Sequence, residues 1–101
     1  MITNCLVIAG EVVKQPSFST SPAGIEHCQF SIEHKSVQQE AGLNRQAYVR
    51  MQVMATGELS HITHELIAGS NVEVTGFIHR HEARNGNPLL VLHAQRIEMI
   101  I

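Results

Sequence analysis

Hydrophobic and polar residues alternate over most of this chain, with the two-residue period of half-buried β-strands. The pattern predicts strands over residues 27–35 and 47–56, each with one core face and one polar face. The inward residues of these two strands are expected to be Cys28, Phe30, Ile32, Val49, Met51, Val53 and Ala55. The polar stretch between them, residues 36–46, contains Gly42 and predicts the loop of a long hairpin.

Two regions interrupt this alternation. Residues 4–13 form a continuous apolar run rich in β-branched residues, which is typical of a strand. A long turn follows it, marked by Pro16, Pro22 and Gly24. Between Gly57 and Gly69 the spacing of apolar residues is helical, which predicts a short helix with Gly69 as its C-cap. The apolar face of this helix consists of Leu59, Ile62 and Leu66.

The last third of the chain predicts a hairpin of two strands. Its turn signal is the sequence RNGNP at residues 84–88, which lies between two alternating runs. The inward residues of the two runs are Val72, Val74, Gly76, Ile78, Leu90, Leu92 and Ala94. The phase then slips so that Ile97 and Met99 can also face inward, which predicts a bulge near Gln95.

The predicted order is therefore three strands, a short helix and two strands. That order is typical of the OB-fold, an all-β, five-stranded, partly open barrel, here with the helix between strands 3 and 4. The 101 residues are enough for one modest core and too few for two, so residues 1–101 are expected to form a single OB-fold domain.

Composition and charge limit the functions that such a domain can have. Hydrophobic residues make up 44% of the chain and charged residues 16%, as in an ordinary globular protein. No apolar run approaches the roughly 20 residues needed to span a bilayer, and the N-terminus lacks the features of a signal peptide. A cytoplasmic protein without membrane contact is expected. The formal net charge of -2 argues against strong, indiscriminate binding to nucleic acid.

The sequence offers no metal site, cofactor site or catalytic centre. His61 and His64 are followed by Glu65, but the zinc-protease motifs place their glutamate elsewhere. His79 and His81 share a strand face without an evident third ligand. The two cysteines do not form a C-x-x-C pair. No G-x-S-x-G, P-loop or G-x-G-x-x-G sequence occurs, so an enzyme is not expected.

A candidate binding face lies on the outward side of the central hairpin. Tyr48 and Arg50 alternate there with core residues, while Lys35 ends the neighbouring strand. Arg45 is expected in the loop between the strands. An aromatic side chain among cations is typical of a platform on which bases of single-stranded nucleic acid stack, although Tyr48 could also simply cover the sheet edge. OB-folds also bind oligonucleotides with the loop between strands 4 and 5, which here is flanked by Arg80, His81 and Arg84.

Three segments, in this order and spacing, carry a resemblance to a known family: HCQF at 27–30, EHKSVQQEAG at 33–42 and VLHA at 91–94. They resemble the bacterial primosomal replication protein N (PriB) family, and the similarity runs over essentially the whole chain. The resemblance implies an OB-fold homodimer that binds single-stranded DNA, stabilises a complex of the PriA helicase with DNA and promotes assembly with DnaT in replication restart. Two alternatives remain open, a protein-interaction adaptor with weak DNA binding and a general single-strand DNA-binding protein.

By position, the resemblance implies DNA-binding roles for individual residues. Tyr48 matches the stacking aromatic, Lys35 a basic DNA contact, and Arg84 a lysine of the loop between strands 4 and 5. Leu43 stands where the family frequently has an aromatic residue. The sequence departs from the family at three commonly basic positions, namely Ser19, Glu82 and Leu89. The candidate nucleic-acid-binding residues are Lys35, Tyr48, Arg84, Arg45, Arg50, Arg80 and Leu43.

The first strand also predicts a homodimer. Its outward residues are as apolar as its inward ones, and an exposed apolar edge strand invites aggregation unless it is paired. Pairing with a second copy about a two-fold axis is the commonest solution. The expected interface residues are Cys5, Val7 and Ala9.

Overall fold

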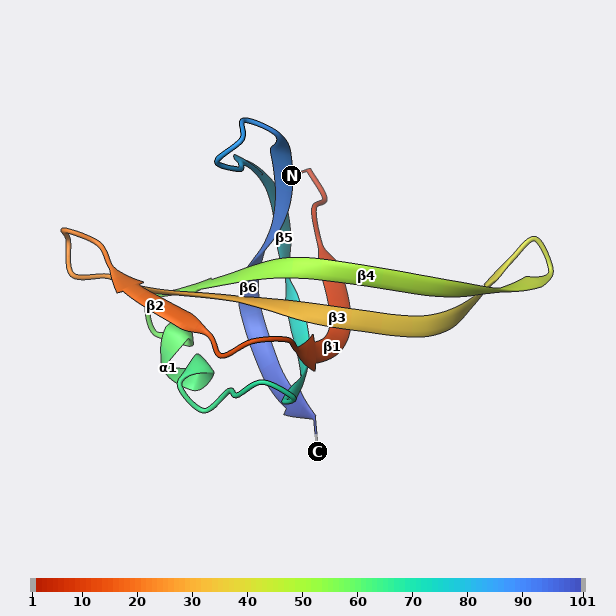
Figure 1. Ribbon diagram of the computed structural model, residues 1–101, viewed down its shortest axis with the longest axis horizontal. Coiled ribbons are helices and arrows are strands. Elements are labelled where there is room, and N and C mark those ends of the chain that lie inside the picture. The colour runs from red at the N-terminus through yellow and green to blue at the C-terminus, as the bar shows by residue number, and fades with distance from the viewer. Residues whose placement is uncertain (1, 101) are drawn as a thin grey trace.

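The computed structural model describes residues 2–100, which form a ring of strands with two projecting hairpins (Figure 1). Within this part of the chain the elements are β1 Leu6–Val12, β2 Ser17–Thr20, β3 Glu26–Glu40, β4 Leu43–Thr56, α1 Leu59–Thr63, β5 Asn71–Glu82 and β6 Pro88–Ile100. The sheet order is β1-β5-β6-β4-β3-β2, and a second pairing between β1 and β3 closes the ring. With α1 between the third and fourth strands of the ring, this arrangement confirms the predicted OB-fold.

The ring closes where β1 passes from one neighbour to another. Residues 6–11 pair antiparallel with β5, and the last two residues of β1 pair with Glu33 and Ile32 of β3. Gly10 permits this close approach, because a Cβ atom there would lie 2.7 Å from the backbone oxygen of Glu33. A short parallel contact between β4 and β6 completes the ring, whereas the other pairings are antiparallel.

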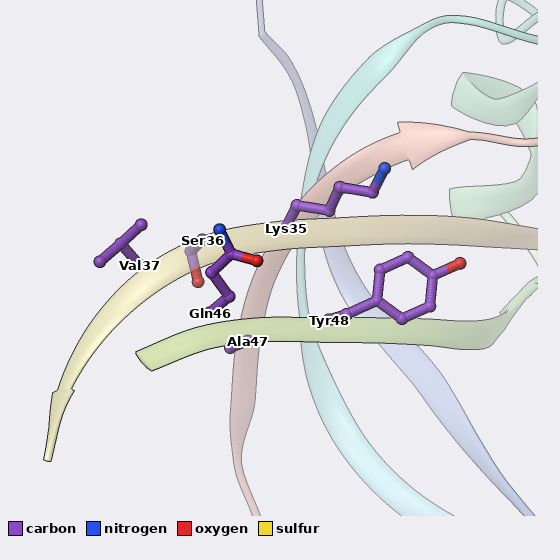
Figure 2. Close-up of a pocket in the computed structure, with 6 residues that line it drawn as sticks. All are labelled: Lys35, Ser36, Val37, Gln46, Ala47 and Tyr48. Carbon is purple, nitrogen blue, oxygen red and sulfur yellow. The ribbon is translucent and has the colours of Figure 1, made fainter. Parts of the chain in front are cut away.

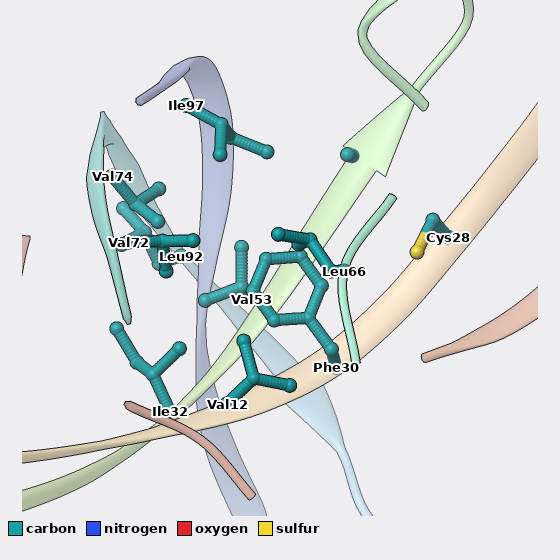
Figure 3. Close-up of a cluster of buried hydrophobic side chains, with 11 residues drawn as sticks. Val12, Cys28, Phe30, Ile32, Val53, Leu66, Val72, Val74, Leu92 and Ile97 are labelled. Atoms are coloured by element: carbon teal, nitrogen blue, oxygen red, sulfur yellow. The ribbon is translucent and has the colours of Figure 1, made fainter. Parts of the chain in front are cut away.

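The core fills the ring, and most of its residues are ones that the alternation placed inward (Figure 3). Cys28, Phe30 and Ile32 of β3 are buried, as are Val53 and Ala55 of β4, so the predicted core face of the central hairpin is confirmed. The rest of the buried cluster consists of Val12, Leu66, Val72, Val74, Leu92 and Ile97. Burial of this apolar surface is the main favourable contribution to folding.

The segment expected to be a long turn between the first two strands contains a strand of its own. The four residues of β2 pair antiparallel with β3, from Ser17 opposite Gln29 to Thr20 opposite Glu26. All four are exposed, so the segment has no buried phase and therefore no alternation that could have revealed it. β2 lies outside the closed ring, at the edge of the sheet.

The central hairpin is longer than predicted. Residues 36–46 were expected to form a loop, but they continue both strands, and only Ala41 and Gly42 form the turn, with φ angles of 51° and 77°. Residues 36–47 therefore form an arm that extends beyond the core (Figure 1). The arm is mostly exposed on both faces. A strand with two solvated faces needs no hydrophobic alternation, which is why its sequence resembles that of a loop.

The predicted helix is shorter than expected and turns a different face inward. α1 buries Ser60 and Thr63, whereas Ile62 is 41% exposed. Leu66 is buried as predicted, but it lies after the end of the helix. Gly69 does not cap α1, because with a φ of 95° it lies in a separate turn before β5.

The C-terminal hairpin and its bulge are confirmed. β5 and β6 are joined by residues 83–87, where Gly86 has a positive φ of 82°. The register shifts between Thr75 and Gly76, which leaves Gln95 of β6 without a directly opposite partner.

Two residues predicted to face the core are exposed instead. Leu90 is 57% exposed and Met99 46% exposed. Leu90 lies opposite Arg80 in the outer part of the hairpin, and Met99 lies near the end of β6. Both residues lie on the same face of β6 as its core residues, but they lie beyond the buried cluster toward the two ends of the strand.

We expect Gly76→Ala to destabilise the barrel at the bulge. A Cβ atom at this position would overlap the backbone carbonyl of His93, so the two strands would have to separate. Overpacking of this kind typically costs about 1–3 kcal/mol in the free energy of unfolding. Urea denaturation at one fixed protein concentration would measure the loss. The neighbouring change Thr75→Ala is the control and should cost less than about 1 kcal/mol, and equal stabilities of the two variants would contradict the steric argument.

Candidate nucleic-acid interface

Two cross-strand pairs form the outward face of the central hairpin. Lys35 of β3 lies directly opposite Tyr48 of β4, and Glu33 lies opposite Arg50. Directly opposite residues project from the same face of a sheet, so we call these four residues the platform. Tyr48 is 58% exposed, and the Lys35 ammonium lies 5.7 Å from the centroid of its ring. Lys35 was expected at the end of its strand but lies within it, because β3 continues into the arm.

Glu33 joins the other members of the platform. Its Oε1 atom accepts one hydrogen bond of 2.7 Å from the Tyr48 hydroxyl and another of 2.8 Å from Nη2 of Arg50. The bond from Arg50, followed by that from Tyr48, lowers the pKa of Glu33. In turn, the hydrogen bond to Glu33 raises the pKa of the Tyr48 hydroxyl and of the Arg50 guanidinium. All three groups therefore keep their ordinary neutral-pH protonation states.

The sequence alone did not assign Glu33 to this site. Glu33 and Lys35 have the same phase in β3, but the residue that each of them meets depends on the register of β3 against β4. If residues 36–46 form a loop, the sequence does not determine the register of β3 against β4. The two-residue turn at Ala41 and Gly42 fixes it, because the turn length sets the pairing of the two strands.

A shallow hollow of about 390 Å³ borders the platform on the side of the arm. It is lined by Lys35, Ser36, Val37, Gln46, Ala47 and Tyr48. Figure 2 shows the Lys35 chain and the Tyr48 ring projecting from the two neighbouring strands, with Val37 and Gln46 further out along the arm. Aromatic and aliphatic surface next to an ammonium group suits a flat ring that carries an anion.

Arg45 and Leu43 lie on the opposite face of the arm from Tyr48. Both belong to β4 rather than to a loop, and they have the phase of the core residues of that strand. Arg45 makes an exposed ion pair of 3.0 Å with Glu40, and Leu43 is 63% exposed. The structure therefore separates these two candidates from the platform by the thickness of the sheet.

Arg80 and Arg84 lie on the second projecting hairpin. Arg80 belongs to β5, and Arg84 lies in the turn before β6. Figure 1 shows this hairpin and the arm projecting in different directions from the barrel. Among residues 2–100, no hydrogen bond or ion pair connects these arginines with the platform. The candidate residues thus form three groups: those of the platform, the pair on the other face of the arm, and the arginines of the β5–β6 hairpin.

Three histidines gather on β5 and β6, and His93 is the member that the sequence did not reveal. Its Nε2 atom lies 2.9 Å from Nε2 of His81, and its ring stacks on Phe77 with centroids 5.0 Å apart. The ring of His79 approaches both other histidines edge-on. Burial, followed by the charges of His81 and His79, lowers the pKa of His93. Within residues 2–100, no group of three or more His, Cys, Asp or Glu residues could hold a metal ion.

The histidine pair near α1 makes structural contacts. Nε2 of His64 lies 2.9 Å from Oε1 of Glu26, and its ring stacks on Phe18 with centroids 4.0 Å apart. The ring of His61 lies 6.5 Å from that of His64. These contacts hold β2 and β3 against the segment that follows α1.

The sequence matches the model of a family described as "Another single-strand binding protein family" over residues 4–96. The replication restart protein PriB of Photorhabdus laumondii is 55% identical over 101 residues, which cover 99% of this chain and 96% of the relative. The chain belongs to the PriB family. The PriB proteins of Proteus mirabilis and of Escherichia coli O1:K1 are 54% and 50% identical, each with 96% of the relative covered.

Solved structures show the same fold at much lower sequence identity. PriB from Ralstonia solanacearum superposes with a TM-score of 0.81 at 20% identity, covering 97% of this chain and 98% of that one. The single-stranded DNA binding protein from Thermus aquaticus also gives a TM-score of 0.81, at 15% identity, covering 98% of this chain and 50% of that one. PriB and single-strand binding proteins thus share one OB-fold.

Membership of the PriB family confirms the resemblance inferred from the sequence. It also confirms that the chain is not an enzyme, because PriB and single-strand binding proteins are non-enzymatic DNA-binding proteins. Among residues 2–100, no helix has the length and the apolar character needed to cross a membrane.

Proposed function

We propose that this chain binds single-stranded DNA as an accessory protein of replication restart in the bacterial cytoplasm, acting as a single OB-fold unit. In this role it stabilises a complex of the PriA helicase with DNA and promotes assembly with DnaT. The observation that carries the proposal is the exposed Tyr48 ring beside Lys35 on the outward face of the OB-fold. The family to which the chain belongs supports the same role.

Tyr48 offers a base a stacking surface that does not depend on sequence. Stacking on an aromatic side chain tolerates any base, because every base has a π-face. The bond between the Tyr48 hydroxyl and Glu33 restrains the ring before DNA arrives, so less side-chain freedom is lost on binding. The hollow of about 390 Å³ beside the ring leaves room for the neighbouring nucleotide, and Lys35 is placed to contact its phosphate.

The affinity depends on few cations, because the chain as a whole carries a net charge of -2. Lys35 is the platform cation that makes no ion pair among the described residues. Arg80 and Arg84 add two cations on the β5–β6 hairpin. Contacts with about 2 to 4 phosphates give a single-strand salt slope of only about -1.4 to -2.8 in log affinity against log salt. We infer modest, salt-sensitive binding.

The tip of the β5–β6 hairpin is our candidate for a contact shared by DNA and the helicase. Arg80, His81, Glu82 and Arg84 give it mixed charge. A surface used only for phosphate gains nothing from Glu82, whereas a surface that must also release DNA can use moderate affinity. The helicase would then compete with DNA for this tip and for the platform.

The edge of β1 supports a homodimer. Residues 6–8 pair with β5 on one side, and among residues 2–100 no strand pairs with their other side. Val7 is 56% exposed, Cys5 is exposed, and Ala9 is half-buried on the same phase. A second copy of β1 could pair there about a two-fold axis and cover these apolar side chains.

We expect wild-type protein to prefer single-stranded to duplex oligonucleotides in fluorescence anisotropy titrations. Tyr48→Ala should weaken binding by about 5- to 150-fold without changing the salt slope, because it removes stacking and leaves the cations in place. Tyr48→Phe is the matched control, since it keeps the ring and should retain most of the affinity. Equal affinity for duplex and single strands would contradict the stacking argument. Undetectable DNA binding with intact helicase binding would instead support a protein-interaction adaptor.

We expect excess single-stranded oligonucleotide to suppress binding of the PriA helicase if the two ligands share the hairpin tip. Arg84→Glu should then weaken both complexes. Arg96→Glu on the outward side of β6 makes the same charge change away from the tip and should leave helicase binding unaffected. Formation of a ternary complex with undiminished affinities, or loss of DNA binding alone in Arg84→Glu, would show that the sites are separate.

We expect light scattering at micromolar concentration to give the mass of a dimer. Val7→Lys should shift the mass toward the 11.2 kDa monomer, because a charge at the paired edge would be buried without a partner. Val37→Lys, at an exposed valine of the arm, is the control and should remain a dimer. A monomer mass for the wild type would exclude the β1 interface.

A further inference from the structure

Arg50 differs from Lys35 in that its charge is already paired within the platform. Nη2 of Arg50 lies 2.8 Å from Oε1 of Glu33, while the Arg50 side chain remains 55% exposed. Among the residues that the structure describes, Lys35 makes no ion pair; its ammonium lies over the face of the Tyr48 ring and acts on Glu33 only as the weakest of the causes that lower the pKa of that carboxyl. The two cations of one face are therefore in different electrostatic states before DNA binds.

Glu33 occupies one donor atom of Arg50, Nη2, and places its negative charge beside the remaining N–H groups. Carboxylates and phosphates are both acceptors that guanidinium groups bind through charge-assisted hydrogen bonds. A phosphate that approaches Arg50 must either displace Glu33 or lie next to its negative charge. Glu11 of β1, directly opposite Glu33 where the ring closes, adds a second negative charge on this side. Phosphate contact with Arg50 is thus unfavourable as long as Glu33 is ionised.

We propose that Glu33 is an internal competitor of DNA phosphates for Arg50 and sets the modest affinity of the platform. The inference rests on the proposed function, because it concerns the same DNA-binding face. In the free protein Glu33 keeps Arg50 paired, so Lys35 provides the phosphate contact and Arg50 contributes little to the salt dependence. Glu33 is at the same time a positioning residue for Tyr48, whose hydroxyl it holds at 2.7 Å.

Glu33→Gln separates these two roles of Glu33. The amide oxygen of glutamine can still accept the hydrogen bonds from Tyr48 and Arg50, so the ring keeps a partner. The negative charge is lost, and Arg50 becomes available to a phosphate. Glu65→Gln is the matched control, since Glu65 is exposed in the turn after α1 and its replacement changes the net charge equally.

The test compares single-stranded oligonucleotide affinity and salt slope for the wild type, Glu33→Gln, Arg50→Gln, their double variant, Lys35→Gln and the control Glu65→Gln. Glu33→Gln should bind about two- to fivefold more tightly than the wild type, as expected for release of one exposed ion pair. Its salt slope should be steeper by about 0.7, because one more phosphate is neutralised. Arg50→Gln alone should leave the slope nearly unchanged, whereas Lys35→Gln should flatten it by about 0.7. The double variant should have the slope of Arg50→Gln.

Three results would overturn the inference. The first is an Arg50→Gln slope as flat as that of Lys35→Gln, which would mean that Arg50 already contacts phosphate, and this comparison does not require Glu33→Gln to fold. The second is an affinity gain in Glu33→Gln no larger than that in Glu65→Gln. The third is a steeper slope for Glu33→Gln even when Arg50 has been replaced. Failure of the wild type to bind single strands would instead refute the proposed function itself.

An optical titration checks the Glu33 contact without DNA. Tyr48 is the only tyrosine and the chain has no tryptophan, so ultraviolet absorbance at alkaline pH reports this hydroxyl alone. The hydrogen bond to the Glu33 carboxylate raises the pKa of Tyr48 above its ordinary value of 10.0, because ionisation breaks the bond and places two negative charges together. In Glu33→Gln the pKa should fall toward 10.0, with circular dichroism confirming that the fold persists. An unchanged pKa would show that the contact is absent in solution.

Discussion

The contact of β1 with the backbone of Glu33 closes the barrel, and the side chain of the same residue belongs to the candidate site. Gly10 makes it possible, because any side chain there would collide with the Glu33 carbonyl. His34, the next residue, adds a hydrogen bond of 2.7 Å between Nδ1 and the carbonyl of Ala9. β3 is thus fixed by β1 on one side and by β4 on the other. The register of the β3–β4 hairpin brings the Glu33 carboxylate to Tyr48 and Arg50, while closure fixes the backbone of the same residue, so packing and binding chemistry meet at Glu33.

The alternation of residue types predicted those parts of the fold that have one buried face. It identified the core face of β3 around Phe30 and the bulge at Gln95, because burial forces apolar residues onto one phase. It missed β2 and residues 36–46 of the arm, whose strands are stabilised by backbone pairing and are almost entirely exposed on both faces. It also placed Gly69 at a helix end, although the helix stops earlier. Local pattern alone contains no information about strands that do not contribute to the core.

Three residues of the platform were predictable from the sequence, but Glu33 and the arrangement of the four were not. Tyr48 and Lys35 stood out because an aromatic and a cation alternate with core residues. Their pairing, and the presence of Glu33 between Tyr48 and Arg50, followed only from the register of the hairpin. The separation of the platform from the β5–β6 hairpin also required the three-dimensional path of the chain (Figure 1). Contacts across strands depend on pairing that periodicity within one strand does not specify.

The solvated arm has a consequence for the motions of the molecule. Its strands pair with each other as far as the turn at Ala41 and Gly42, but the buried cluster lies elsewhere, in the ring. Segments with few buried apolar contacts open at a lower free energy than the global unfolding transition. Amide hydrogens of the arm should therefore exchange with solvent through local opening of the hairpin. Those near Phe30 should exchange more slowly, because their exchange requires unfolding of the ring. The hollow beside Tyr48 is lined by residues of the arm and of the adjoining strands, so it lies where the packed ring meets a hairpin that opens more readily.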